Sequence, residues 1–141
     1  MIVLATLTDV KEIVALEENS LKETLGEEMI TSLIQNELTR VYVYKEDNKI
    51  IGYISYLFDG AVVEIYNLAV LDKYQGQGIG TKILDYVVNI FKNDDVSYIL
   101  EVRVSNYKAI NLYKKFNFKE IRVRKNYYGS EDALVLARFG E

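Results

Sequence analysis

The chain has 141 residues, half of them hydrophobic and 27% charged, which is typical of one globular domain over residues 1–141. Cys and His are absent, which excludes disulfides, thiol nucleophiles, His bases and the usual zinc sites, so we expect no metal. The net charge of −4 argues against a nucleic-acid partner, and the short apolar runs and the lack of a signal-peptide pattern predict a cytoplasmic protein outside the membrane.

The N-terminal part of the chain has helical periodicity. Thr8 can cap a first helix. The apolar residues that follow it at helical spacing are Val10, Ile13, Val14 and Leu21. A second helix is expected from about Glu27. Its apolar face consists of Ile30, Leu33, Ile34 and Leu38.

Three strands are predicted next, because the pattern changes to that of extended segments. They cover residues 41–44, 50–58 and 61–70. Asp47 and Asn48 favour a tight turn between the first two strands, and the Asp59-Gly60 pair favours another turn before the third.

Beyond residue 80 the chain alternates between helices and strands. An amphipathic helix is predicted from the spacing of Ile83, Leu84, Val87, Val88 and Phe91. In the strand expected at 98–105, Glu101, Arg103 and Ser105 point to one face. A further helix is predicted from the spacing of Ala109, Leu112, Tyr113 and Phe116.

The last of these helices should end at Asn117, since asparagine tolerates the left-handed conformation. Two final strands, at 119–125 and 133–139, flank a turn at Gly129. The order of elements along the whole chain predicts an α+β or mixed α/β fold.

A glycine-rich loop lies between the strand at 61–70 and the helix that follows. Its residues are Gln75, Gly76, Gln77, Gly78, Ile79, Gly80 and Thr81. Backbone N–H groups in such a loop can point outward and, together with the positive end of the helix dipole, suit a phosphate. The spacing matches neither a Walker loop nor a dinucleotide fingerprint. A flexible connection is the alternative reading.

The pattern Gln-x-x-Gly-x-Gly, after a strand that carries Leu68, Ala69 and Val70, resembles motif A of the GNAT family of N-acetyltransferases. Within that family, the chain from about Asn67 onward resembles the branch that acetylates the N-terminal alanine of ribosomal proteins. The similar stretches are residues 100–106, 109–113, 118, 124–128 and 131–133.

The resemblance implies a mixed, mostly antiparallel sheet of about six to seven strands flanked by about four helices. It also implies direct transfer of an acetyl group from acetyl-CoA to an amine in a ternary complex. The coenzyme's pyrophosphate would bind the glycine-rich loop, and backbone groups of Leu68, Ala69 and Val70 would hold its pantetheine arm and acetyl carbonyl. The implied acceptor is a protein N-terminus, with a ribosomal protein that begins with alanine as the leading candidate.

Three residues match functional positions of the family. Glu101 resembles the general base, acting through a water, and Tyr113 resembles the general acid that protonates the departing thiolate. Asn106 resembles a residue that hydrogen-bonds the pantetheine arm. Each also has an ordinary structural reading, as a solvent-facing strand carboxylate, a core tyrosine and a helix N-cap respectively.

A further set of residues near the C-terminus either lines the acceptor side or forms a turn. The set is Asn126, Tyr127, Tyr128, Glu131 and Asp132.

The chain departs from the branch in the segment 19–26, which reads Asn-Ser-Leu-Lys-Glu-Thr-Leu-Gly where the branch has a Pro-Trp-Ser-like segment that shapes the acceptor site. Asn117 also replaces the glycine that the family usually has at this helix end. Two other functions therefore stay open. One is an enzyme of the same fold that acetylates a lysine side chain or a small amine, and the other is a coenzyme-binding module without turnover.

Overall fold

A seven-stranded sheet forms the centre of the protein, in a computed structural model that describes residues 1–140. Its strands are β1 (Ile2–Leu4), β2 (Thr39–Glu46), β3 (Lys49–Phe58), β4 (Val62–Val70), β5 (Ser97–Arg103), β6 (Lys119–Arg124) and β7 (Ala133–Arg138). They are arranged in the order β1-β2-β3-β4-β5-β7-β6. Neighbouring strands are antiparallel except β4 and β5, which are parallel. The predicted mixed, mostly antiparallel sheet is confirmed.

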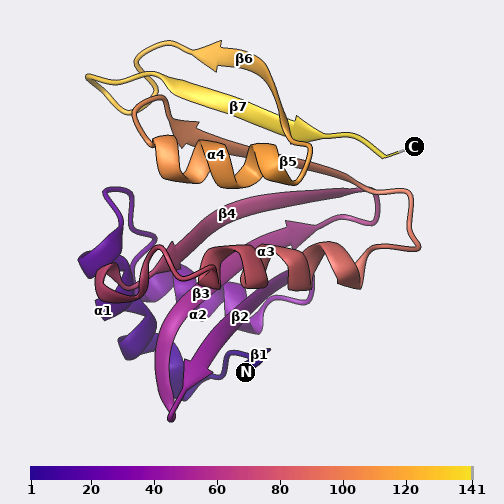
Figure 1. Ribbon diagram of the computed structural model, residues 1–141. Coiled ribbons are helices and arrows are strands. Elements are labelled where there is room, and N and C mark those ends of the chain that lie inside the picture. Colours follow the sequence, from indigo (N-terminus) through magenta and orange to yellow (C-terminus); the bar gives the residue numbers. More distant parts are fainter. Residues whose placement is uncertain (141) are drawn as a thin grey trace.

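Helices cover both faces of the sheet. They are α1 (Val10–Ser20), α2 (Glu27–Gln35), α3 (Ile79–Ile90) and α4 (Tyr107–Lys115), with short 3-10 helices η1 (Leu7–Asp9) and η2 (Asp72–Tyr74). Helices α3 and α4 pack on one face, and α1 and α2 pack on the other (Figure 1). Within residues 1–140, no helix is long and apolar enough to cross a membrane.

Two hydrophobic cores result from this layering. The alternation along β5 shows how the sequence separates them, because Leu100 and Val102 pack into the core under α3 and α4. Glu101 and Arg103, which alternate with them, point to the opposite face. The polar residues of β5 therefore lie on the side of the sheet that also carries α1 and α2.

Two predicted turns have the expected backbone conformation. Asp47 and Asn48, which connect β2 to β3, both have positive φ angles, 53° and 63°, as a two-residue hairpin turn requires. Asn117 follows α4 with a φ of 67°, so it ends the helix in the left-handed conformation that glycine usually provides there.

The N-terminal elements differ from the sequence-based expectation. Strand β1 was not expected, because three residues are too short for a pattern to identify. Thr8 does not cap α1, since it lies inside η1, and the turn is closed instead by Asp9, whose Oδ2 accepts a hydrogen bond from the Thr6 N–H at 2.8 Å. Leu38 does not belong to the apolar face of α2, which ends at Gln35, and its side chain is 57% exposed.

The expected strand at 98–105 is also too long at its C-terminal end. Strand β5 stops at Arg103, because the Ser105 N–H donates to the Glu131 carboxylate at 2.9 Å instead of continuing the ladder. Asn106 follows this early stop by three residues and is the N-cap of α4.

Candidate active site

The two parallel strands at the centre of the sheet separate along their length. Strand β4 pairs with β5 only where Val62–Glu64 lies beside Ser97–Ile99. Its other edge stays paired with β3 as far as Val70. The edge that carries Leu68, Ala69 and Val70 is therefore not paired with β5. This separation leaves backbone groups of β4 available inside the sheet, as the predicted role of Leu68, Ala69 and Val70 requires.

The glycine-rich loop lies at the open end of this gap, where it connects η2 to α3. Gly76 and Gly78 have φ angles of 79° and 81°, and Gly78 is the N-cap of α3. Residues with side chains rarely adopt this conformation. Gly80 has a different role, because a Cβ there would lie 3.3 Å from Leu112, so this glycine allows α3 and α4 to approach each other. Ile79 is buried, and Thr81 and Gln77 are exposed.

A lysine from α4 reaches this loop, which the sequence analysis did not anticipate. Lys108 Nζ donates to Gln75 Oε1 at 3.2 Å, and Gln75 Nε2 donates to the Val70 carbonyl at 2.9 Å. A positive charge, two left-handed glycines and a helix N-terminus thus meet at one place, and this combination fits a pyrophosphate. The signal in the sequence that could have identified Lys108 is its position in the first turn of the helix after β5. Helices α3 and α4 begin at the same end of the sheet (Figure 1), so a lysine there lies near the glycine-rich loop.

Glu101 lies on the α1 and α2 side of β5. Its Oε1 accepts a hydrogen bond from Arg124 Nη1 at 2.6 Å, and its side chain is 26% exposed. Arg124 stacks on the ring of Tyr127 at 4.3 Å, and the Glu101 carboxylate raises the pKa of Tyr127. The carboxylate is therefore held by β6 and the turn that follows it, while still accessible to solvent.

Tyr113 lies on the other side of the sheet, in the core under α4. Its ring packs against Phe118, with 5.2 Å between the centroids. Burial raises the pKa of Tyr113, so the phenol keeps its proton at neutral pH. Asn106 caps the same helix, because its Oδ1 accepts from the Ala109 N–H at 3.2 Å. Glu101 and Tyr113 thus flank β5 from opposite faces.

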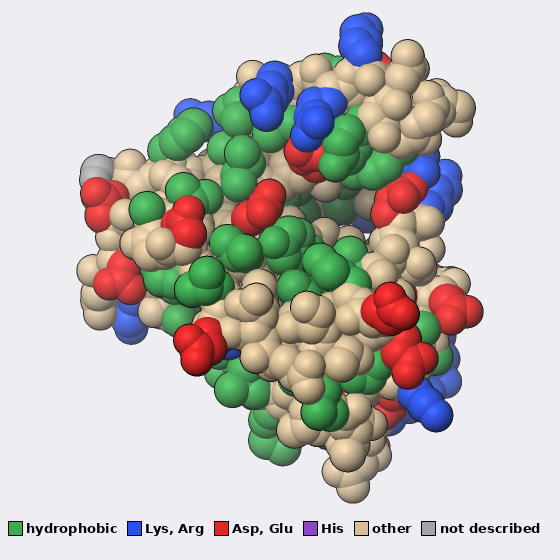
Figure 2. Space-filling view, turned by 180° about the vertical axis from the view of Figure 1, so that it is seen from behind, with side chains coloured by type: hydrophobic (Ala, Val, Ile, Leu, Met, Phe, Trp, Pro, Cys, Tyr) green, Lys and Arg blue, Asp and Glu red, His purple; other side chains and the backbone are tan. Residues whose placement is uncertain are grey.

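A pocket of about 300 Å³ opens beside Glu101. It is lined by Ser20, Leu21, Lys22, Glu23, Asn67, Glu101, Val102, Arg103, Ser105, Asn106 and Tyr128. Four of these residues come from the segment 19–26, in which the chain departs from the alanine-acetylating branch. Figure 2, which views the molecule from behind, shows that this side is hollowed near its middle and that acidic side chains lie around the hollow.

An ion-pair network closes one wall of the pocket. The Arg103 guanidinium donates to Glu23 and, at 2.9 Å, to Glu131, and it lies 4.6 Å from the ring of Tyr128. Of the residues expected to be either acceptor-lining or part of a turn, Tyr128 lines the pocket and Glu131 supports it. Asn126 and Asp132 form the turn, since the Asn126 N–H donates to Asp132 at 2.8 Å.

This network predicts a pH dependence of stability. Hydrogen bonds from Ser105 and Arg103 lower the pKa of Glu131 to about 2. A carboxylate whose pKa is lower in the folded state stabilises that state above its unfolded pKa, about 4.3 for Glu, and loses this effect as the pH falls through the folded value. Glu131→Gln should therefore lower the melting temperature at neutral pH, and the difference from wild type should shrink between about pH 4.3 and pH 2. Thermal melts across this range test this expectation, with Glu18→Gln at an exposed position of α1 as control. A difference that stays constant across the range would contradict the assignment.

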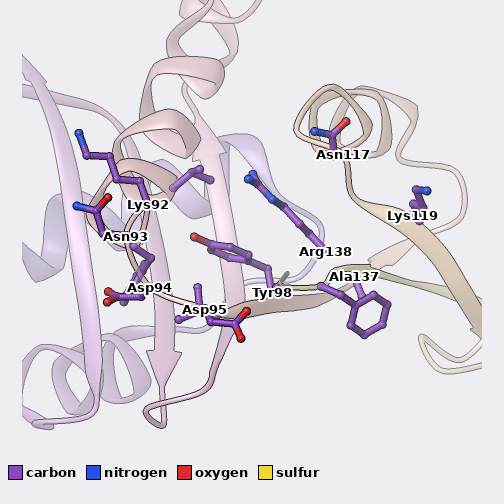
Figure 3. Close-up of a pocket in the computed structure, with 14 residues that line it drawn as sticks. Lys92, Asn93, Asp94, Asp95, Tyr98, Asn117, Lys119, Ala137 and Arg138 are labelled. Carbon is purple, nitrogen blue, oxygen red and sulfur yellow. The ribbon is translucent and has the colours of Figure 1, made fainter.

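A larger cavity, of about 710 Å³, lies at the other end of α3 (Figure 3). Lys92, Asp94, Asp95, Tyr98 and Arg138 are among its lining residues, and the Arg138 guanidinium lies 5.7 Å from the Tyr98 ring. None of the residues expected in the acetyl-transfer site lines it. The cavity therefore has no part in the site built from the glycine-rich loop and β5.

Comparisons with known proteins agree with this geometry. The family model described as "Acetyltransferase (GNAT) family" matches residues 8–118. An N-alpha-acetyltransferase from Saccharolobus solfataricus is 34% identical over 152 residues, which cover 95% of this chain and 89% of that protein.

Two further comparisons involve Escherichia coli. Its [ribosomal protein bS18]-alanine N-acetyltransferase is 40% identical over 78 residues, 52% of this chain and 53% of that protein. The crystal structure of the ribosomal-protein-S18-alanine N-acetyltransferase from the same organism superimposes with a TM-score of 0.91 at 27% identity, and covers 100% of this chain and 94% of that one.

Proposed function

Because the chain belongs to the GNAT family of acetyltransferases and is an acetyltransferase itself, we propose that it transfers the acetyl group of acetyl-CoA to the N-terminal α-amine of a protein. The leading acceptor is a ribosomal protein that begins with alanine, and residues 1–141 act as one N-acetyltransferase domain. One observation carries the proposal: β4 and β5 are paired only as far as Glu64, with a phosphate-type loop after β4 and a pocket lined by Glu101 on the other side of β5.

The coenzyme would bind from the side of α3 and α4. Backbone N–H groups of the loop 75–81 point at its pyrophosphate, supported by the α3 dipole and the charge of Lys108. The pantetheine arm then enters the gap along the unpaired edge of Leu68, Ala69 and Val70, where backbone groups can hold it and the acetyl carbonyl. Asn106, which caps α4, would also hydrogen-bond the arm.

The acceptor amine would approach from the opposite side, through the pocket beside Glu101. The ammonium group loses its proton to Glu101, by way of a water, and the neutral nitrogen attacks the thioester carbonyl. A C–N bond forms and the C–S bond breaks. The departing thiolate takes a proton from Tyr113, which lies on the coenzyme side of β5. The nitrogen gives up its second proton to solvent as the amide forms, and the Tyr113 phenolate regains a proton from solvent, so that the enzyme returns to its starting state. The proposed roles are consistent with the positions of the two residues, since Glu101 on β5 and Tyr113 on α4 lie on opposite sides of that strand.

An α-amine suits this site better than a lysine side chain. An α-amine has a pKa near 8 and is partly neutral at physiological pH, whereas a lysine amine near 10.4 is almost wholly protonated. A weak base such as Glu101 therefore has to remove a proton from a smaller fraction of the acceptor molecules when the acceptor is an α-amine. Glu101, which is 26% exposed, also brings a carboxylate to this pocket that an ammonium group can approach. The similarity to an N-alpha-acetyltransferase over 95% of the chain supports the same choice.

A lysine side chain or a small-molecule amine is the second candidate acceptor. The observation that favours it is the position of the segment 19–26, because the departure from the alanine-acetylating branch falls on residues that line the pocket.

Two peptides of identical sequence distinguish these candidates. One begins with a free alanine, and the other has a blocked N-terminus and an accessible lysine. With acetyl-CoA present, thiol release and the mass of each peptide report the rate and position of acetylation. We expect the free N-terminus to react faster. Faster acetylation of the blocked peptide would overturn the proposal in favour of a lysine acceptor.

A further inference from the structure

One carboxylate in the core has no part in the mechanism above. Glu17, near the end of α1, is fully buried, with an exposed fraction of 0%. Burial of a charged group is costly unless hydrogen bonds compensate for the lost water. A glutamate in this position therefore needs several donors, and the identity of those donors indicates what it does.

Four donors from three parts of the fold surround the Glu17 carboxylate. Oε2 accepts from the Leu25 N–H at 3.0 Å, the Tyr53 hydroxyl at 2.6 Å and Asn67 Nδ2 at 3.2 Å, and Oε1 accepts from the Gly26 N–H at 3.2 Å. Leu25 and Gly26 end the connection between α1 and α2. Tyr53 lies on β3 and Asn67 on β4. The carboxylate thus fastens this connection to the centre of the sheet.

The fastened segment forms one wall of the pocket next to Glu101. Residues 20–23 line that pocket, and Asn67, which donates to Glu17, lines it as well. Asn67 Nδ2 also donates to the Glu23 carbonyl at 3.1 Å. Glu17 therefore hydrogen-bonds directly to the segment 19–26 and to strand β4. An acceptor in the pocket would lie beside both of them.

Glu17 is placed to position other groups and not to move protons. Its two oxygens already accept four hydrogen bonds, and its side chain has no solvent exposure. A group enclosed in this way does not reach an acceptor amine. We infer that Glu17 is a positioning residue that sets the affinity of the pocket for its amine acceptor, with no direct effect on the binding of the coenzyme. This inference rests on the proposed function, because that proposal identifies the pocket as the acceptor site.

The test uses Glu17→Gln, which keeps the shape of the side chain but turns one acceptor oxygen into an NH2 group that faces donors. Glu18→Gln is the matched control, since Glu18 is the next residue of the same helix and is exposed. KM for the alanine peptide and for the blocked lysine peptide, kcat, and coenzyme A affinity are measured for the full chain. For the faster peptide, Glu17→Gln should raise KM by roughly tenfold or more, because small displacements of positioning groups have effects of this size. Coenzyme A affinity should stay within about twofold of wild type. The reason is that Glu17 positions groups on the acceptor side of the sheet, so its loss weakens the binding of the acceptor and not that of the coenzyme.

Two more variants distinguish a wrong role for Glu17 from a wrong position of the acceptor site. Tyr53→Phe removes one donor and keeps the ring, so it should shift the same KM in the same direction even if Glu17→Gln does not fold. Tyr128→Ala changes the pocket wall directly. If Tyr128→Ala raises the acceptor KM while Glu17→Gln and Tyr53→Phe leave it unchanged, the role of Glu17 is wrong and the pocket remains the acceptor site. If none of the three changes it, the proposed acceptor site fails as well. Equal losses of acceptor and coenzyme affinity in Glu17→Gln would also overturn the inference, since they indicate general loosening of the fold.

Discussion

Glu101→Gln is expected to lower kcat by about a hundredfold to ten-thousandfold, the usual effect of removing a general base. The variant keeps the size of the side chain and can still interact with Arg124, so the pocket should keep its shape. Coenzyme A affinity should not change, because Glu101 lies on the opposite side of the sheet from the glycine-rich loop. Steady-state rates at saturating substrates, together with coenzyme A titrations, measure both quantities.

The matched acid variant is Tyr113→Phe, which removes only the hydroxyl and leaves the contact with Phe118. It should also lower kcat more than it lowers coenzyme affinity. Glu46→Gln and Tyr107→Phe are controls of the same chemistry at exposed positions, since Glu46 ends β2 and the Tyr107 side chain is 71% exposed. Rates within about twofold of wild type in both site variants would contradict the acid and base roles, since such groups contribute at least about a hundredfold.

Gly78→Glu should abolish detectable binding of coenzyme A. The glycine has a φ of 81° and caps α3, so a glutamate there strains the backbone and brings a negative charge to the place where the pyrophosphate would lie. Saturating coenzyme A should stabilise the wild type by about 2.7 kcal/mol at a hundred times its Kd. The variant should show no such thermal shift.

The matched control for this variant is Gly60→Glu, in the turn between β3 and β4. Gly60 also has a positive φ, 100°, and open space around the position of a Cβ. Gly60→Glu introduces the same charge and a comparable backbone strain away from the glycine-rich loop, so coenzyme A should still produce the wild-type thermal shift. If Gly78→Glu folds and keeps the wild-type shift, the coenzyme binds elsewhere.

Local patterns in the sequence predicted the parts of the fold that depend on local chemistry. Asp47 and Asn48 predicted the turn between β2 and β3, and Asn117 predicted the end of α4. The turn and the helix end both require residues that tolerate a positive φ angle. The prediction for Leu38 was wrong, because its spacing continues the apolar pattern of α2 although that helix ends at Gln35 and Leu38 is exposed. A spacing pattern alone does not locate the residue at which a helix ends.

The site was harder to predict than the fold, since its contacts join residues far apart in the chain. Glu101, Asn106 and Tyr113 are predicted through a family resemblance, while Lys108 and Glu17 are not predicted. The sequence did contain a signal for Glu17. This residue follows Ile13 by four positions, so it falls on the apolar face of α1, where a charged residue requires buried partners. Those partners, Tyr53 and Asn67, only become neighbours when β3 and β4 pair.

The most direct test of the proposed acetyl transfer is a crystal structure of the chain with a bisubstrate analogue, in which coenzyme A is joined through an acetyl group to the α-nitrogen of an alanine peptide. We expect the pyrophosphate to contact the backbone of residues 75–81, the acetyl linkage to pass between β4 and β5, and the peptide to lie in the pocket beside Glu101. A pyrophosphate bound away from the glycine-rich loop, or a peptide that leaves the gap without entering that pocket, would contradict it.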